Sequence, residues 1–378
     1  MNASSPDIEL PADLRPVDGR FGSGPSKVRA ESLTALLATG DKYLGTSHRQ
    51  SPVRAVVGRL RTAMTDLFAL PEGYEVVFGN GGAAYFWDVA VFSLIERRSQ
   101  HLSFGNFSES FATMVANAPH LDAPDIVESP AGTHPVAKPN TDVDAYALTQ
   151  NETSTGVAME VLRPAPADEG LVLVDATSAA GGMRVDPGEF DVYYFSPQKC
   201  FGADGGLWIA ICSPAALARV DKIKATGRWI PESLSLGTAV ENARLNQTYN
   251  TPGLATLFLM ADQTDWILGN GGLEWAASRC ETSTNILYGW AEKSEFATPF
   301  VADHADRSPV VATIDLDDSI DAKAVNKVLR ANGIVDTEPY RRLGRNQLRV
   351  AVFPSVEPDD VELLTAAVDY VVSALSKG

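Results

Sequence analysis

The sequence predicts an α/β protein of two domains, and three observations support that prediction. Apolar runs of strand length alternate with stretches of helical spacing, which is typical of a mostly parallel sheet covered by helices on both faces. The chain has 378 residues, more than a single hydrophobic core usually supports. A glycine-rich break, Gly269-Asn270-Gly271-Gly272, separates a larger N-terminal part from a smaller C-terminal part.

The larger part shows its elements in order along the chain. A helix is expected over residues 52–68, where apolar side chains recur on one face and Ser51 and Pro52 suit the start. A second helix follows from Tyr85, after a glycine-rich turn. Strands are expected at residues 75–78, 102–104, 145–148, 171–174, 192–195 and 207–211.

The smaller part begins with a helix from Leu273 and continues with expected strands at residues 310–315 and 347–352. It closes with a helix that starts at Pro358 and carries apolar residues on one face. The resulting domain limits are an N-terminal extension (1–20), loosely structured as far as residue 16, a large domain (21–268) and a small α+β domain (269–378).

Composition and charge exclude several classes of function. Asp and Glu number 48 against 31 Lys and Arg, and the net charge of −17 would repel nucleic acid and anionic membranes. No apolar run approaches the length of a membrane span, and the first residues do not resemble a signal peptide. Three cysteines and five scattered histidines predict no disulfide framework and no metal site. We therefore expect a cytoplasmic protein.

Lys199 is the residue that most strongly indicates chemistry. It follows the strand-like run 192–195, and Asp175 ends the run 171–174. A lysine amine can form a Schiff base with the aldehyde of pyridoxal phosphate, and a carboxylate can keep the cofactor's ring nitrogen protonated. Most lysines are solvated surface charges, but the apolar and small residues around Lys199 favour a functional role.

Three loops that follow strands could complete such a site, because ligands gather at the carboxyl ends of parallel strands. Gly79-Asn80-Gly81-Gly82-Ala83-Ala84 could bind a phosphate at the start of the next helix or form a tight turn. Beside Lys199 and Asp175, the phosphate site is the better interpretation. Phe107 could stack on a cofactor or belong to the core. The polar run 151–156 could bind cofactor oxygens or cap a turn.

Basic residues gather at two places in this acidic chain. His48 and Arg49 precede the first long helix. The second group has no acidic residue within it and consists of Arg341, Arg342, Arg345 and Arg349. Arginine binds carboxylates and phosphates through two contacts, so the groups predict an anionic substrate with two acidic ends. A solvated basic surface is the alternative. Arg349 lies inside an apolar run, where a partly buried arginine needs a partner.

Together these motifs resemble the phosphoserine aminotransferase family, whose members are fold-type-I pyridoxal phosphate enzymes. Single motifs are weak, but their order and spacing are specific and extend over most of the chain, and the likeness is to the shorter, actinobacterial-like branch. The matching segments are Phe21-Gly22-Ser23-Gly24-Pro25-Ser26-Lys27, Ser47-His48-Arg49, Gly81-Gly82, Asn151-Glu152-Thr153, Val174-Asp175-Ala176-Thr177-Ser178, Ser196-Pro197-Gln198-Lys199 and Tyr249-Asn250-Thr251-Pro252.

The resemblance implies reversible transamination on the fold-type-I scaffold. Glutamate would give its amino group to pyridoxal phosphate, and 3-phosphohydroxypyruvate would receive it, leaving 2-oxoglutarate and phosphoserine. The implied pathway is serine biosynthesis, and a related phosphorylated keto acid of vitamin B6 synthesis stays open. The family also implies a homodimer with shared active sites.

The resemblance assigns roles residue by residue. Lys199 would hold the cofactor and shuttle a proton, and Asp175 would pair with the ring nitrogen. The other expected cofactor contacts are Gly82, Ala83, Phe107, Thr153 and Gln198 from one subunit, with Asn250 and Thr251 from the other. The expected substrate contacts are Arg349 for the α-carboxylate, and His48 and Arg49 with Arg341 or Arg342 for the phosphate or the glutamate side chain.

Three positions depart from the family pattern. Ala83-Ala84 stand where many members have an arginine, Phe107 where many have tryptophan, and Arg341-Arg342 where a His-Arg pair is common. The departures leave the cofactor assignment intact and the phosphate-binding residues open.

Two alternative functions remain. A serine–pyruvate or alanine–glyoxylate aminotransferase on the same scaffold would not need the basic residues at 48–49 and 341–345. A non-catalytic protein that binds a ligand or partner on this fold would not need Lys199 together with Asp175.

Overall fold

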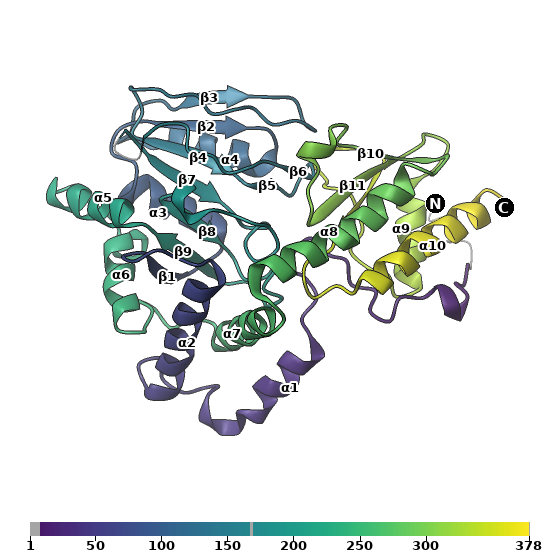
Figure 1. Cartoon of the computed structure of the whole chain (residues 1–378), viewed down its shortest axis with the longest axis horizontal. Coiled ribbons are helices and arrows are strands. Elements are labelled where there is room, and N and C mark those ends of the chain that lie inside the picture. The colour runs from purple at the N-terminus through teal and green to yellow at the C-terminus, as the bar shows by residue number, and fades with distance from the viewer. Residues whose placement is uncertain (1–7, 167–168, 378) are drawn as a thin grey trace.

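The structure, a computed structural model, describes residues 8–166 and 169–377. A large lobe is built on a seven-stranded sheet and a smaller lobe on a three-stranded sheet (Figure 1). This architecture confirms the predicted α/β fold. Within the described residues, no helix is both long enough and apolar enough to cross a membrane.

The large sheet runs in the order β1-β9-β8-β7-β4-β2-β3, and β9 is antiparallel to both of its neighbours while the other pairs are parallel. Asp175 ends β7 and lies opposite Thr149 of β4 and Tyr194 of β8. The carboxyl ends of these three parallel strands therefore meet at one edge. The strands are β1 (Glu75–Asn80), β2 (Ser99–Ser103), β3 (Asp125–Glu128), β4 (Ala145–Thr149), β7 (Leu171–Asp175), β8 (Val192–Phe195) and β9 (Leu207–Cys212), and a separate hairpin joins β5 (Asn151–Glu152) to β6 (Val157–Ala158).

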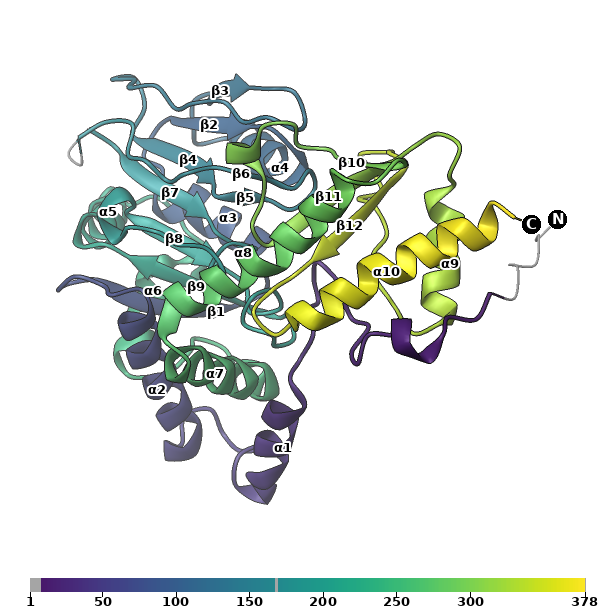
Figure 2. The same cartoon turned by 45° about the vertical axis from the view of Figure 1, so that its right-hand side comes forward.

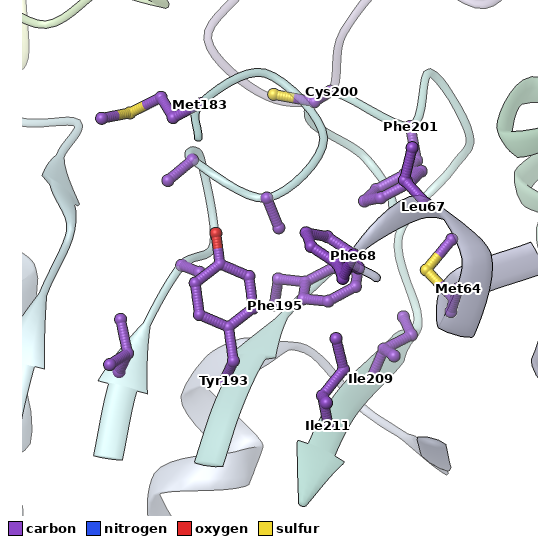
Figure 3. Packing of buried hydrophobic residues seen from close by; sticks show 14 of the residues in the cluster. Met64, Leu67, Phe68, Met183, Tyr193, Phe195, Cys200, Phe201, Ile209 and Ile211 are labelled. Atoms are coloured by element: carbon purple, nitrogen blue, oxygen red, sulfur yellow. The ribbon is translucent and has the colours of Figure 1, made fainter. Parts of the chain in front are cut away.

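Both faces of the large sheet are buried, which explains why its strands read as continuous apolar runs. In β8, Tyr193 and Phe195 belong to one core cluster and Val192 and Tyr194 to the other. Figure 3 shows part of the first cluster, where the ring of Phe68 lies 5.5 Å from that of Tyr193 and 6.2 Å from that of Phe195. The helices on that face are α2 (Ser51–Leu67) and α7 (Leu254–Gly269), with α1 (Ala30–Ala38) against α7; those on the opposite face are α3 (Ala83–Ser93), α4 (Asn106–Ala116), α5 (Pro214–Ala225) and α6 (Leu236–Arg244).

The small lobe packs helices on one antiparallel sheet. Its strands are β10 (Ala297–Pro299), β11 (Val311–Leu316) and β12 (Gln347–Ala351), and its helices are α8 (Gly272–Ala291), α9 (Ala322–Ala331) and α10 (Pro358–Leu375). Helix α8 crosses from one lobe to the other (Figure 2). Its first half gives Cys280 to the core of the large lobe, and its second half gives Leu287 to that of the small lobe.

The segment that precedes the large lobe is more ordered than we expected. The expectation of loose structure as far as residue 16 is wrong for residues 8–16, because Leu10 is buried in the core of the small lobe. The backbone N–H of Val17 also donates to Asp360 Oδ1 over 2.7 Å. A single buried leucine leaves no periodic pattern in the sequence, so its contacts could not be predicted. Residues 1–7 of the expected extension lie outside the described residues, and the domain limits stay a prediction.

Candidate active site

A cavity of about 200 Å³ lies at the carboxyl ends of β4 and β7, beside the first turns of α3 and α4. All the cofactor contacts that we expected from a single subunit line it. Its wall consists of Gly82, Ala83, Ala84, Trp87, Phe107, Thr149, Asn151, Thr153, Asp175, Thr177, Gln198 and Lys199. A larger groove of about 870 Å³ holds no lysine, and its two arginines, Arg184 and Arg307, are in ion pairs. The smaller cavity is therefore the candidate site.

Lys199 enters the cavity from the loop after β8 and is buried. Its Nζ donates to the backbone carbonyl of Ser23, and Ser26 Oγ donates to the backbone carbonyl of Lys199 over 2.6 Å. Burial, together with the positive charge of Arg349, lowers the pKa of Lys199 to about 8. Near neutral pH the amine is thus more often uncharged than an ordinary lysine, and the uncharged form is the nucleophile.

The segment around Gly24 covers Lys199 from the N-terminal side. A Cβ atom at Gly24 would lie 2.4 Å from Lys199 Nζ, and the residue has a φ of +130°, which side chains rarely adopt. Glycine is required here on both counts. The family resemblance included this segment without giving it a role in the site.

Asp175 is a buried carboxylate held by three donors. Its Oδ1 accepts from the backbone N–H and the hydroxyl of Thr177, and its Oδ2 accepts from the indole N–H of Trp87 over 3.0 Å. Burial raises the pKa of Asp175, and the hydrogen bonds from Thr177 and Trp87 oppose that rise. A cationic partner inside the cavity would stabilise the ionised form further.

Phe107 lies in the first turn of α4, which a buried carboxylate holds in place. Glu152 Oε2 accepts from the backbone N–H groups of Phe107 and Ser108 over 3.1 and 3.0 Å. Glu152 is fully buried, and burial raises its pKa. Gly105 permits the approach, since a Cβ atom there would lie 2.3 Å from the side chain of Glu152. The arrangement fixes the aromatic ring at the cavity wall.

The first turn of α3 is another part of the cavity wall, and its N–H groups could bind an anion. Among the described residues, no side chain caps the N-terminus of this helix, and Gly82, Ala83 and Ala84 leave its first N–H groups uncovered. Such groups, with the positive end of the helix dipole, bind phosphate. Two polar atoms of the cavity residues, Asn151 Oδ1 and Gln198 Oε1, are buried without a hydrogen-bond partner among the described residues. The anion site, amine, carboxylate and aromatic ring together fit pyridoxal phosphate.

Arg349, on β12 of the small lobe, lies beside the cavity but is not one of its lining residues. Its Nη1 donates to the backbone carbonyl of Thr153 over 3.3 Å, and its guanidinium lies 5.3 Å from the ring centre of Tyr340. Its Nε is buried and has no partner within the residues that the structure describes. Burial lowers the pKa of Arg349. A guanidinium with donors to spare, beside a reactive amine, can bind a carboxylate.

The other arginines of the C-terminal group lie in different environments. Arg345 pairs with Asp315 over 2.5 Å and lies over the ring of Phe300, so its charge is already neutralised. Arg342 donates to Asn106 Oδ1 over 2.8 Å, which connects the small lobe to the start of α4. Arg341 is exposed. Of these three, Arg342 is the one joined to an element of the cavity wall.

His48, Arg49, Asn250 and Thr251 do not line the cavity of their own chain. They form a second group, in which His48 Nδ1 lies 3.1 Å from Thr251 Oγ1 and Arg49 donates to Gln247 over 2.9 Å. Their roles in binding therefore remain predictions for a second subunit.

Reasoning from the sequence missed two cavity residues, Trp87 and Thr149, and gave no role to Thr177. Trp87 follows Ala83 by four residues, so the two share a face of α3. A residue one helical turn after the glycine-rich loop is expected on the same face as that loop, so the spacing could have predicted Trp87 as a cavity residue.

Comparisons with known proteins agree with this geometry. The family model of the class-V aminotransferases matches residues 135–337. A protein of Mycolicibacterium vanbaalenii that carries the name phosphoserine aminotransferase provisionally is 61% identical over 98% of this chain and 99% of its own. The phosphoserine aminotransferase of Rhodococcus jostii is 57% identical over 97% of this chain and 98% of its own.

The fold is also found among solved structures. The phosphoserine aminotransferase of Cytophaga hutchinsonii superimposes with a TM-score of 0.85, covers 93% of this chain and 99% of its own, and is 24% identical in sequence. At that identity the likeness supports the fold alone.

Proposed function

Because the chain belongs to the phosphoserine aminotransferase family of the class-V aminotransferases, we infer that it exchanges an amino group between glutamate and 3-phosphohydroxypyruvate. The products of that exchange are 2-oxoglutarate and phosphoserine. The observation that carries the inference is the cavity in which the Lys199 amine and the Asp175 carboxylate are both buried.

The cofactor is pyridoxal phosphate, which when bound supplies a cationic ring that stabilises negative charge on the substrate α-carbon. Lys199 Nζ is its attachment point, and Asp175 would hold the proton of its ring nitrogen. The N–H groups at the start of α3 would bind its phosphate, and the ring of Phe107 would cover one face. Thr153 and Gln198 would bind its polar edge.

Lys199 would also move the proton that transamination transfers. With its pKa lowered to about 8, Nζ would be able to take a proton from the substrate α-carbon near neutral pH. Arg349 would orient that carbon by binding the α-carboxylate, which glutamate and the keto acid have in common.

We further propose a cytoplasmic homodimer with shared active sites. His48 and Arg49 would bind the substrate phosphate or the glutamate side chain in the cavity of the other subunit, where Asn250 and Thr251 would reach the cofactor phosphate. The proposal is supported by their position away from their own cavity and by the exposed side chains of Leu37 and Leu245. A second subunit would bury such apolar surface. Arg342 would assist at the substrate's distal end.

The substrate assignment is tested by comparing phosphorylated and unphosphorylated keto acids. The wild type is expected to use 3-phosphohydroxypyruvate at a far higher kcat/KM than pyruvate, and Arg49→Ala should raise KM for the phosphorylated substrate without weakening cofactor binding. Equal rates with both keto acids would contradict the assignment and favour a serine–pyruvate type of enzyme.

A further inference from the structure

Asp175 has one acceptor position left, and its location can be read from the hydrogen bonds. An ionised carboxylate has about four lone-pair positions, two on each oxygen. Thr177 occupies both positions of Oδ1, through its backbone N–H over 3.0 Å and its hydroxyl over 2.5 Å. Trp87 occupies one position of Oδ2 over 3.0 Å. Among the described residues, no hydrogen bond takes the second position of Oδ2, the oxygen that Trp87 holds. The buried hydroxyl of Tyr194 lies close to Asp175 and Trp87 but has no hydrogen-bond partner in the described part of the chain.

The indole of Trp87 is itself held rigidly. Its side chain is 6% exposed and belongs to the core cluster on the α3 side of the sheet. Its ring stacks on Phe111 of α4, with 5.8 Å between centroids and 14° between planes. A donor fixed in this way also fixes the acceptor, because an indole presents one N–H in one direction.

Helix α3 brings this donor and the anion site into one rigid element. Ala83, in the first turn, and Trp87, one turn later, both line the cavity. The distance between the uncovered N–H groups and the indole N–H is therefore set by the helix, which rises about 5.4 Å per turn. A ligand with an anion at one end and a protonated ring nitrogen at the other could bind the N–H groups with its anion and donate to the carboxylate of Asp175, which the indole N–H holds.

We propose that Trp87 is a positioning residue for the cofactor, and that its N–H fixes Asp175 Oδ2 so that the free lone pair faces the cofactor's ring nitrogen. The role rests on the proposed function, since it presupposes that pyridoxal phosphate occupies the cavity. Trp87 would thereby favour ligands that carry a proton on that nitrogen, without contacting the substrate.

The test measures how tightly the cofactor-free protein binds two ligands. One is pyridoxal phosphate, and the other is its 1-deaza analogue, in which a C–H replaces the ring nitrogen. Trp87→Phe removes the N–H and keeps an aromatic ring against Phe111. We expect the Kd for pyridoxal phosphate to rise about tenfold, as for a hydrogen bond to a charged group, and the Kd for the analogue to change less than about twofold.

Three controls separate positioning from packing. Trp208→Phe alters another buried tryptophan, whose Nε1 has no hydrogen-bond partner among the described residues, and should leave both Kd values unchanged. In an Asp175→Asn background, Trp87→Phe should not change the preference any further, where the preference is the ratio of the Kd for the 1-deaza analogue to the Kd for pyridoxal phosphate. Trp87→His, which retains a ring N–H, should keep more of the wild-type preference than Trp87→Phe. Should Trp87→Phe not fold, Trp87→Leu takes its place in that comparison.

The outcomes distinguish this proposal from the function on which it rests. A wild type that does not bind pyridoxal phosphate, or that binds both ligands equally well, would contradict the proposed function. A wild type that prefers pyridoxal phosphate, with Trp87→Phe retaining the full preference, would leave the function intact and overturn the role of Trp87.

Discussion

At the residue scale, the protein keeps two oppositely charged groups buried in one cavity and shifts both toward neutrality. Burial lowers the pKa of Lys199 to about 8 and raises that of Asp175. Both shifts oppose charge, so the cavity by itself is an unfavourable place for either ion. A cofactor that bonds to the amine and offers a proton to the carboxylate relieves both costs. The two buried groups therefore lower the free energy of unfolding of the cofactor-free protein.

The contribution of Lys199 to this loss of stability can be measured in the cofactor-free protein. Because the pKa of Lys199 falls from 10.5 in the unfolded chain to about 8 in the folded one, the unfolded chain binds more protons between these values. Stability conferred by this residue should therefore rise with pH across that window. Relative to Lys199→Met, the wild type should gain about 2.5 kcal/mol of unfolding free energy between pH 7 and pH 10, as measured with urea. Parallel curves for the two proteins would refute the pKa shift.

Tyr340 supports the arginine that we assign to the substrate α-carboxylate. Its ring lies 5.3 Å from the guanidinium of Arg349 and 5.8 Å from the ring of Phe107. Tyr340→Ala should raise KM for glutamate and for the keto acid alike, by about fivefold, since a partly desolvated cation–π contact is worth about 1 kcal/mol. Tyr340→Phe should behave like the wild type in steady-state kinetics. Tyr370→Ala, at a partly exposed position of α10, is the matched control. A large change in kcat at unchanged KM would argue against this role.

The sequence predicted residues of the site better than their partners. Lys199, Asp175 and Phe107 could be chosen because each lies at or just beyond the end of a strand, and the ends of parallel strands meet at the carboxyl edge of their sheet. The pairing of Arg345 with Asp315 could not be foreseen, because it depends on the register between β11 and β12. Arg345 was grouped with Arg349 by sequence alone, and the structure separates the two by environment.

At the scale of elements, the site depends on where α3 and α4 begin. Both helices start at the carboxyl edge of the sheet, and the first N–H groups of each are available to an acceptor. For α4 that acceptor is Glu152, supplied by the short β5–β6 hairpin. For α3 no side chain among the described residues takes the place, which leaves it for a ligand.

Glu152→Gln tests this account of α4. Both oxygens of Glu152 accept from backbone N–H groups, so either orientation of the amide would set its NH₂ against the donors of Phe107 and Ser108 or against those of Ser154. We therefore expect a loss of about 3 kcal/mol in unfolding free energy. The control is Glu109→Gln, an exposed position on the same helix, which should change stability by less than about 0.5 kcal/mol. Thermal or urea unfolding measures both. Equal effects of the two substitutions would show that the buried carboxylate does not hold the helix.

Some elements were predicted from their pattern and others were missed, among them α9, although its apolar residues recur on one face. The expected helix at residues 52–68 matches α2, and the six strands expected in the large lobe match β1, β2, β4, β7, β8 and β9. Helix α4 was missed, since its sequence begins with polar residues that read as a continuing loop. The edge strand β3 was missed because its exposed residues break the apolar run.

At the scale of the whole molecule, the second group of predicted site residues lies outside the cavity that the described residues of the same chain form. Lys199 lines the cavity, and Arg49 lies in a separate group bonded to Gln247. A symmetric pair of chains could bring the groups together twice, once at each site. Nothing in a single sequence states which of its residues act on a partner. The resemblance implied this for Asn250 and Thr251, and we extend it to His48 and Arg49 because they lie outside the cavity of their own chain.

Mixing two impaired variants, at a substrate concentration far below the KM of Arg49→Ala, tests the shared site. Lys199→Ala lacks the amine, and Arg49→Ala should bind the phosphorylated substrate poorly. If the site uses Lys199 from one chain and Arg49 from the other, each mixed dimer has one intact site. Refolding the variants together in equal amounts should then restore about one quarter of wild-type activity. Activity that stays at the sum of the two separate variants would place both residues in the same chain's site.

The central claim is that Lys199 is the attachment point of pyridoxal phosphate, and borohydride reduction tests it most directly. The purified protein should be yellow, and reduction should fix the cofactor covalently to the one peptide that contains Lys199, as found by mass spectrometry after proteolysis. Lys199→Ala should carry no such label. A label on another lysine, or a colourless protein that takes up no cofactor when it is added, would contradict the account.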